Sequence, residues 1–338
     1  EAALIALPSS HPAAAQTLPP SPSAQIFAVA SLGARCLAFP PTAPRLRIAN
    51  DTALLAAPLP EAAARLSTVR TCVGAVGGTG SVAASFRLPD AEEVEVVGYA
   101  PQELARVGGW GWILGDEGGG FHVGREAIRH LLRAHELAVL RGVSNPGQLV
   151  DHPDSLRARV LAHFGVASVH ELLTLLHDPD PLETIGDAGT TALPAHRLIT
   201  REKRLSQLSP LVFRAAFGGL EGSGSFVGDP LALSVLRATA AELAEQIALL
   251  LSPPSSGSGS SPSSGSGSSP SSSDLRVPAV TSLLVLGGSL VGVPAYRTLV
   301  LDALAERGHV FACVEYVADA AEAGARGLVA QFASKRLD

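Results

Sequence analysis

Residues 108–124 read GGWGWILGDEGGGFHVG, the most glycine-rich stretch of the chain. Apolar side chains then recur at helical spacing, at Ile128, Leu131, Leu132, Leu137 and Leu140. This period, with Gly142 after it, predicts a helix over residues 125–141. Glycine turns of this kind expose backbone N–H groups that can approach a phosphate closely.

Two further glycine clusters follow predicted buried strands. The run TCVGAV at 71–76 ends in Gly77-Gly78-Thr79-Gly80-Ser81, and SVAASFR at 81–87 has the pattern of a returning hairpin strand. The run TSLLVL at 281–286 ends in Gly287-Gly288-Ser289. Neither cluster fits a Walker A loop or the dinucleotide-binding G-x-G-x-x-G pattern. Taken singly, each of the three clusters is more often a tight turn than a binding site.

The C-terminal part of the chain predicts an α/β unit. Pro294 opens a helix to about Glu306, residues 309–317 (HVFACVEYV) form a strand, and residues 319–334 form a last helix. Strand, helix and strand at this spacing imply parallel pairing. Upstream, capping signals at Ser168, Ser209 and Asp229 predict further helices, the longest over 231–251.

The N-terminal part carries weaker signals. Residues 1–24 are rich in Ala, Pro and Ser without a sustained period, and they are predicted to be disordered. Short strands are predicted over 25–31 and 45–49. The second of these leads into Asn50-Asp51 and a short helix over about 52–55.

Residues 252–273 contain only Ser, Pro and Gly. They offer no apolar side chain for burial, so a disordered tether is predicted. The ends of such a tether lie roughly 26 Å apart on average and can come closer. It can therefore be an insertion in a surface loop, because the entropy of loop closure grows only with the logarithm of length.

Composition excludes several classes of protein. The chain has 338 residues and a net charge of −6, without the basic character of a nucleic-acid-binding protein. Its three cysteines lie far apart and no H-E-x-x-H motif occurs, so neither disulfides nor a metal site is predicted. A reduced, cytoplasmic location is the expectation. The uncharged stretch Val277–Tyr296 is interrupted by glycines and prolines, which favours a strand and a turn over a membrane span.

The polar and glycine motifs form a more specific pattern when they are taken in order. They are Asn50-Asp51, Gly78-Thr79-Gly80-Ser81, Gly108-Gly109-Trp110-Gly111, Asp116-Glu117-Gly118, Gly228-Asp229-Pro230 and Leu286-Gly287-Gly288-Ser289. This order and spacing resembles the BadF/BadG/BcrA/BcrD ATPase family, and within it the N-acetylglucosamine kinases. The resemblance covers roughly residues 45–251 and 275–333, and GGWGWILGDEGGGFHVGREAIR is its most telling piece.

The resemblance implies the α/β fold of the actin-like ATPases, in which ATP and sugar lie between two ribonuclease H-like lobes. It implies ATP-dependent phosphorylation of the 6-hydroxyl of N-acetylglucosamine or a related amino sugar, with Mg²⁺ held mainly by phosphate oxygens and water. No nucleic-acid or membrane partner is implied, and a homodimer is one possible oligomeric state.

Individual roles are likewise implied by the resemblance. Asp51 matches the general base that accepts the proton of the sugar hydroxyl. The residues that match the loop beneath the β- and γ-phosphates and the turn against adenosine are Gly78, Thr79, Gly80, Gly288 and Ser289. The residues that match the substrate site, including the acetamido pocket, are Asn50, Asp51, Ser81, Gly108, Gly109 and Asp116.

The chain departs from the family at its beginning. The family opens with an acidic hairpin of the type D-G-G-G-T-x-T that binds phosphate, and residues 1–44 contain no Asp. The chain also begins with Glu1 and contains no methionine, so a missing N-terminus is expected. The predicted organisation is a remnant of the first lobe over 25–72 and a nearly complete second lobe over 73–338, with kinase activity impaired.

Other interpretations remain open at this stage. The chain can be a catalytically inactive protein that binds sugar or nucleotide, or an ATPase activator of a 2-hydroxyacyl-CoA dehydratase, the other branch of the family. Asp51 can be only a helix cap, and Asp116 and Glu117 can be a solvated turn. Trp110 and Trp112 can be core residues.

Overall fold

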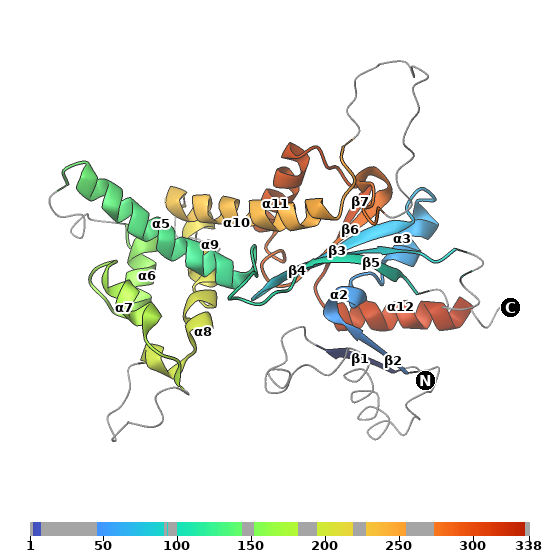
Figure 1. The fold of residues 1–338 in the computed structure, drawn as a ribbon, viewed down its shortest axis with the longest axis horizontal. Coiled ribbons are helices and arrows are strands. Elements are labelled where there is room, and N and C mark those ends of the chain that lie inside the picture. Colours follow the sequence, from blue (N-terminus) through green and yellow to red (C-terminus); the bar gives the residue numbers. More distant parts are fainter. Residues whose placement is uncertain are drawn as a thin grey trace, which may run out of the picture.

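A five-stranded mixed sheet forms the centre of the molecule, with its strands in the order β5-β4-β3-β6-β7 (Figure 1). The strands are β3 Thr71–Gly77, β4 Ser81–Arg87, β5 Gln102–Gly108, β6 Ser282–Gly287 and β7 Cys313–Val317. The computed structural model describes residues 3–7, 46–90, 93, 100–143, 152–181, 195–218, 228–254 and 274–334.

The sheet is antiparallel on one side and parallel on the other. β3 and β4 form the predicted hairpin, with Gly77 opposite Ser81, and β5 pairs antiparallel with β4. β6 runs parallel to β3, and β7 runs parallel to β6 as predicted. If the five strands are numbered 1 to 5 along the chain, their order across the sheet is 3-2-1-4-5, and strand 2 (β4) is antiparallel to its neighbours. This is the sheet of a ribonuclease H-like lobe, so the predicted α/β, actin-like ATPase fold class is confirmed for this lobe.

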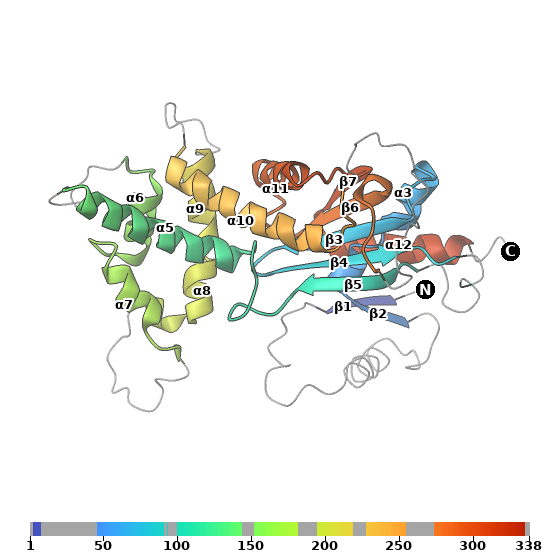
Figure 2. The ribbon, with the colours of Figure 1, turned by 45° about the horizontal axis from the view of Figure 1, so that its top comes forward.

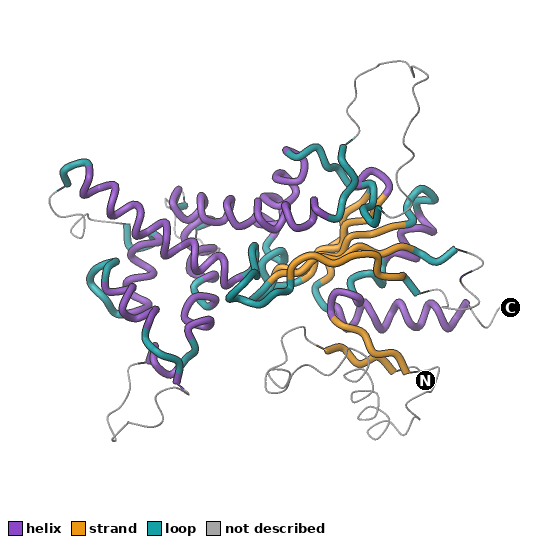
Figure 3. Tube along the Cα trace, viewed as in Figure 1, coloured by secondary structure: helices purple, strands orange, loops and turns teal. Residues whose placement is uncertain are grey.

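Different helices bury the two faces of this sheet (Figure 3). One face packs against α10 Pro230–Leu249 and α11 Pro294–Glu306, and the other packs against the segment that contains α3 Leu59–Arg65. In β6, Leu284 and Leu286 face the first side while Leu283 and Val285 face the second. Burial on both faces explains why the run TSLLVL is almost continuously apolar.

An all-helical region lies beside the sheet and connects β5 to β6. Its helices are α5 Gly120–Leu140, α6 Leu156–Phe164, α7 Glu171–His177, α8 Arg201–Ser206 and α9 Ser209–Phe217, with a 3-10 turn at Ala195–Leu198. α10 belongs to both parts, because it packs against α5 and α9 and then extends over the sheet (Figure 2).

Of the three predicted capping signals, Asp229 is confirmed, and Ser168 is confirmed only in part, because His170 rather than Ser168 directly precedes α7. Asp229 caps α10, since its Oδ1 accepts a hydrogen bond from the Leu231 N–H at 2.7 Å. Its Oδ2 also accepts from the Leu156 N–H of α6, at 2.7 Å. The Ser168 N–H donates to Glu171 at 2.9 Å, which is one half of the predicted capping box. Ser209, by contrast, is the first residue of α9 rather than its cap.

A second, two-stranded sheet lies near α2 Asp51–Leu54 and α12 Ala320–Ser334 (Figure 1). In it β1 Ala3–Leu7 runs parallel to β2 Leu46–Asn50. The prediction of disorder over 1–24 is therefore wrong for Ala3–Leu7. A five-residue apolar run has no period to detect, and it pairs with a strand about 40 residues away, which local patterns do not reveal. β2 confirms the strand predicted at 45–49, whereas the strand predicted at 25–31 lies outside the described residues.

One strand was not predicted, and two other elements begin later or earlier than predicted. β5 was not predicted, because its sequence QELARVG mixes polar and apolar side chains on a half-buried strand. α5 begins at Gly120 rather than at residue 125, because its first turn is held by the β3–β4 turn described below. β7 is limited to Cys313–Val317 instead of the predicted 309–317.

The two flanks of the Ser/Pro/Gly segment lie side by side. Leu251 and Val277 form a parallel bridge, the Ser252 N–H donates to the Val277 oxygen at 2.9 Å, and the Val277 N–H donates to the Leu250 oxygen at 2.9 Å. Residues 255–273 themselves lie outside the described part. The predicted tether thus joins two positions that are in contact, as an insertion in a loop would. Within the described part of the chain, no helix has the length and apolar character needed to cross a membrane.

Candidate functional site

The β3–β4 turn and the start of α5 are joined by main-chain hydrogen bonds. The N–H groups of Gly120 and Phe121 donate to the carbonyl oxygens of Gly78 and Thr79, at 2.8 and 3.0 Å. Helix N-termini have unsatisfied N–H groups, and here the turn supplies their acceptors. The glycine-rich stretch at 108–124 and the predicted phosphate turn are therefore parts of one structure, although about 30 residues separate them.

Asp116 lies against the same turn. Its Oδ1 accepts a hydrogen bond from the Ser81 N–H at 3.3 Å, and a Cβ atom on Gly80 would lie 2.5 Å from that oxygen. The backbone of Asp116 is left-handed, with φ 63°, a conformation that aspartate adopts more readily than most residues. Burial raises the pKa of the Asp116 carboxyl group, the Ser81 N–H opposes this shift, and the nearby Glu117 adds to it.

Ser81 is the point where the three segments of this structure meet. Its carbonyl oxygen accepts from the Gly109 N–H at 2.9 Å, directly after the end of β5 at Gly108. Its hydroxyl group donates to the Glu117 carbonyl oxygen at 2.5 Å, and Ser81 itself is buried. Every hydrogen-bonding group of Ser81 thus fixes the glycine loop against the hairpin.

The turn after β6 adjoins the turn after β3. The Leu290 N–H donates to the Gly77 oxygen at 2.9 Å. Gly288 has φ 101°, and a Cβ atom there would lie 2.6 Å from the same oxygen, so both the conformation and the space require glycine. Because β3 and β6 are parallel, their carboxyl ends share one edge of the sheet, which is where open α/β sheets bind ligands.

Glu117 is not the solvated turn residue that one interpretation of the sequence allowed. Its two carboxylate oxygens accept hydrogen bonds from Arg125 at 2.9 and 2.7 Å, and His122 Nε2 lies 2.9 Å from Oε2. The buried His122 accepts from the Gly118 N–H at its Nδ1 atom, 2.9 Å away, so Nε2 carries the proton that is donated to Glu117. This network stabilises the loop just after Asp116.

The same network continues one turn along α5. Glu126 accepts a hydrogen bond from Arg129 at 2.7 Å and lies 3.6 Å from His122 Nε2. His122 first, and then Arg129, hold the pKa of the nearly buried Glu126 at about 2 although burial alone would raise it. Glu126 is therefore a carboxylate whose charge contributes to the folded state.

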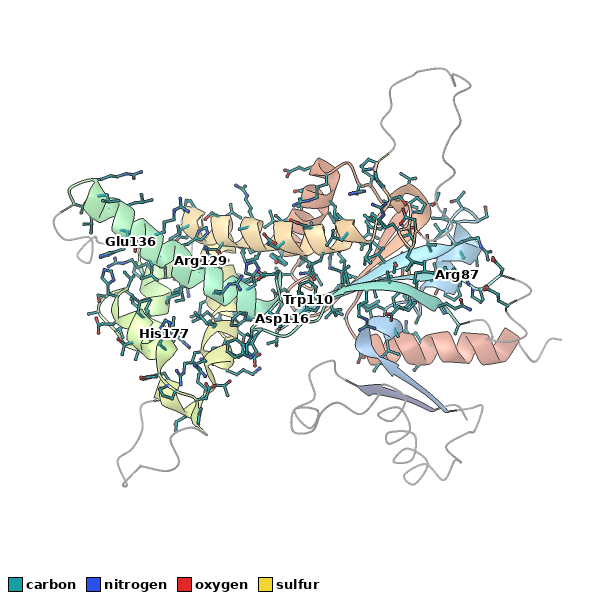
Figure 4. All side chains as sticks on the ribbon, viewed as in Figure 1. Arg87, Trp110, Asp116, Arg129, Glu136 and His177 are labelled. Carbon is teal, nitrogen blue, oxygen red and sulfur yellow. The ribbon has the colours of Figure 1, made fainter. Side chains whose placement is uncertain are left out.

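Trp110 and Trp112, which the sequence allowed as core residues, differ in environment. Trp110 is 67% exposed and does not belong to the core. Trp112 is half-buried and makes an edge-to-face contact with Phe121, with ring centroids 5.4 Å apart. Trp110 and Asp116 lie where the sheet meets the helical region, whereas Arg87 lies at the far end of the sheet (Figure 4).

The structure brings most of the predicted site residues together. Those joined by the contacts above are Gly78, Gly80, Ser81, Gly108, Gly109, Asp116 and Gly288. Thr79 and Ser289 are exposed on the two neighbouring turns. Asn50 ends β2 and Asp51 begins α2, and the side chains of both lie outside the described part of the structure.

The backbone that carries Asp51 nevertheless approaches the same edge of the sheet. Leu55, four residues after Asp51, is buried, and a Cβ atom on Gly287 would lie 2.8 Å from its side chain. This contact fixes the end of the α2 segment over the end of β6. The catalytic role of Asp51 stays a prediction.

The residues present suit a phosphate group better than a metal ion bound directly by the protein. Among the described residues, no main-chain hydrogen bond engages the N–H groups of Thr79 and Gly80, at the exposed end of the turn. No group of three or more His, Cys, Asp or Glu side chains in the described part could hold a metal ion.

Several residues that build this site carry no recognisable signal in the sequence. His122 and Arg125 lie in the first turns of α5, and nothing in the sequence around them predicts that they bind Glu117. Gln246 of α10 contacts Ser81 and the Glu117 carbonyl oxygen from more than 120 residues away. No local pattern marks a glutamine in the middle of a long helix as part of a distant site.

Comparisons with known proteins give similarities at the level of structure. No protein-family model matches the sequence, and no curated protein sequence is similar to it. A crystal structure of a "putative N-acetylglucosamine kinase" from Porphyromonas gingivalis is similar with TM-score 0.49 and 16% identity, covering 92% of this chain and 73% of that one.

A second crystal structure, of a "putative N-acetylglucosamine kinase" from Chromobacterium violaceum, has TM-score 0.42 and 18% identity, covering 88% of this chain and 72% of that one. The fold is assigned from the strand order: the chain contains a ribonuclease H-like lobe whose glycine turns meet at the carboxyl ends of β3 and β6.

Proposed function

We propose that this chain binds ATP and an N-acetyl amino sugar at the carboxyl ends of β3 and β6, and that it phosphorylates the sugar on its 6-hydroxyl group. The observation that carries the proposal is the convergence on Ser81. Asp116, Gly109 and the Glu117 carbonyl oxygen all hydrogen-bond to it, beside the Gly77–Gly288 contact. Glycine turns at the ends of the parallel strands β3 and β6 suit a phosphorylated ligand. The partly desolvated carboxylate of Asp116 beside them suits a ligand with hydroxyl groups.

The β3–β4 turn would hold the phosphates through its backbone. The N–H groups of Thr79 and Gly80 are the available donors, and the absence of side chains at Gly78 and Gly80 allows close approach. The neighbouring Gly288 turn would contact the adenosine. Phosphoryl transfer depends mostly on positioning and on stabilisation of charge, so a rigid turn with backbone donors is a suitable device.

The loop at 108–119 would hold the sugar. Among the described residues, the half-buried carboxylate of Asp116 accepts one long hydrogen bond, from Ser81, so it retains capacity to accept from a sugar hydroxyl or amide group. Gly108 and Gly109, at the end of β5 and beside Ser81, would line the acetamido pocket. Asp51 would accept the proton of the attacking hydroxyl group late in the transfer.

An assay of ADP release with a panel of sugars tests this proposal. We expect turnover with N-acetylglucosamine, N-acetylmannosamine or glucosamine, and none with sugars that lack the 2-amino substituent. Turnover that does not depend on any added sugar, by a folded protein, would contradict the proposal.

Binding without transfer is the second candidate function. Calorimetric binding of sugar with no ADP released over hours would select it.

The dehydratase-activator alternative has less support in the described residues. Cys72 is fully buried, and burial raises the pKa of its thiol, which opposes the thiolate that an iron–sulfur cluster needs. Burial likewise raises the pKa of Cys313. Iron in the purified protein would restore this alternative.

A further inference from the structure

Gln246 of α10 connects the two loops of the proposed site. Its Nε2 donates to the Ser81 hydroxyl at 3.1 Å and to the Glu117 carbonyl oxygen at 2.5 Å. The Ser81 hydroxyl donates to that same carbonyl oxygen at 2.5 Å. The three groups therefore form a closed triangle, in which the amide of Gln246 and the serine hydroxyl share one acceptor.

This triangle fixes the peptide group between Glu117 and Gly118, one residue after Asp116. Asp116 has a left-handed backbone, which is sparsely populated for residues other than glycine and persists where neighbouring contacts determine it. The Glu117 carbonyl oxygen lies one residue further along and has two donors, both from outside its own loop. The direction of the Asp116 carboxylate toward Ser81 depends on that fixed peptide.

The rest of α10 supports the same contact. Leu243 lies one turn before Gln246 on the same face of the helix. A Cβ atom on Gly118 would lie 2.6 Å from the Leu243 Cβ, and one on Gly77 would lie 3.3 Å from its side chain. The oxygen of the Gln246 amide also fills the space beside Gly108, where a Cβ atom would collide with it. Two residues within one turn of α10, Leu243 and Gln246, thus contact both the end of β3 and the loop at 108–119.

We infer that Gln246 is a positioning residue of the proposed site: it holds the Glu117–Gly118 peptide against Ser81 and so sets the direction of the Asp116 carboxylate toward the sugar. The inference rests on the proposed function for the sugar, whereas the loop-holding part of it concerns the free protein. In this role Gln246 acts through the loop and not through proton or phosphoryl transfer.

Hydrogen exchange of the free protein tests the loop-holding part. In Gln246→Glu, an ionised carboxylate replaces the donor and faces the Glu117 carbonyl oxygen, so both hydrogen bonds are lost. We expect the amides of Gly118 and Gly119 to exchange about tenfold faster, the equilibrium factor of roughly one net hydrogen bond. The control is Ala238→Glu, which adds the same charge at an exposed position of α10. Unchanged exchange in Gln246→Glu would overturn the inference.

Sugar affinity and its pH dependence test the second part. We expect Gln246→Glu to raise the KM for the amino sugar about tenfold at pH 8 while the KM for ATP changes less than twofold. Lowering the pH to 5 protonates part of the introduced carboxyl group and restores a donor, so the sugar affinity should recover relative to Ala238→Glu. A purely structural defect would not recover.

Gln246→Asn provides a second variant if Gln246→Glu folds poorly, because its shorter amide cannot reach both acceptors. Wild-type sugar affinity in both variants would overturn the inference. If wild-type protein binds no amino sugar, the proposed function fails, and the exchange experiment alone decides whether Gln246 holds the loop.

Discussion

Gly119→Ala is the substitution that most sharply tests how the glycine loop meets the phosphate turn. A Cβ atom on Gly119 would lie 2.6 Å from the carbonyl carbon, 2.7 Å from the Cα and 2.8 Å from the oxygen of Gly80. All three are backbone atoms, so no flexible side chain can move aside. Gly119 has φ −86°, which alanine adopts without strain, so the effect measures contact alone.

The expected loss of stability has two parts. Overpacking against a fixed backbone costs about 1–3 kcal/mol. Separating the two segments also weakens the bonds from Gly120 to Gly78 and from Phe121 to Thr79, at about 1 kcal/mol each. Together the two parts come to about 3–5 kcal/mol, which corresponds to a Tm lowered by about 6–20 °C, at about 2–4 °C per kcal/mol.

Thermal and urea unfolding of Gly119→Ala and Gly78→Ala form the assay. Gly78→Ala is the matched control, because it lies in the same turn but a Cβ atom there would have no neighbour within 4 Å. We expect the control to unfold within about 0.5 kcal/mol of wild type. If Gly119→Ala is as stable as Gly78→Ala, the reasoning that joins α5 to the hairpin is refuted.

Four other predictions concern separate parts of the molecule. Asp51→Asn should lower kinase turnover about 100-fold or more while sugar affinity is largely kept, and near-normal turnover in an ADP assay would show that Asp51 is not the base. Asp229→Ala removes the cap of α10 and the acceptor of the Leu156 N–H, so urea unfolding should show a loss of about 1–3 kcal/mol; an unchanged midpoint would contradict this. Glu126 has a pKa of about 2 in the folded protein, so its stabilisation is present above about pH 4.3 and is lost as pH falls toward 2. Glu126→Gln should therefore be less stable than wild type at pH 7, with the difference shrinking over that acidic range, and parallel stability curves would argue against it. Deleting residues 254–272 should change Tm by less than about 2 °C, because Leu251 and Val277 are already paired, whereas loss of folding would show that the tether is structural.

The sequence predicts the elements whose signals are local. The hairpin over 71–87 is marked by glycines between two apolar strands, and the strand at 281–286 by an apolar run buried on both faces. The Pro294–Glu306 helix is marked by its N1 proline and is found with the same bounds. Such signals depend on residues within one element, so they can be read without the fold.

Features that depend on distant partners were not predictable from local patterns. β1 is a strand only because β2 lies beside it, and β5 is recognisable only from its pairing with β4. In the site, the glycines and Asp116 can be identified from the sequence because they occur in glycine-rich clusters between predicted elements. Gln246 does not, because a glutamine is ordinary in an amphipathic helix and acquires its role only when α10 reaches Ser81.

Calorimetric titration of N-acetylglucosamine into wild-type protein and Asp116→Ala tests the central claim most directly. The account predicts saturable binding to wild type and an affinity at least about tenfold weaker in the variant, since a carboxylate hydrogen bond contributes about 1.5–3 kcal/mol. Unfolding curves of both proteins establish that they are folded. No binding by folded wild-type protein, or equal affinity in Asp116→Ala, would contradict the account.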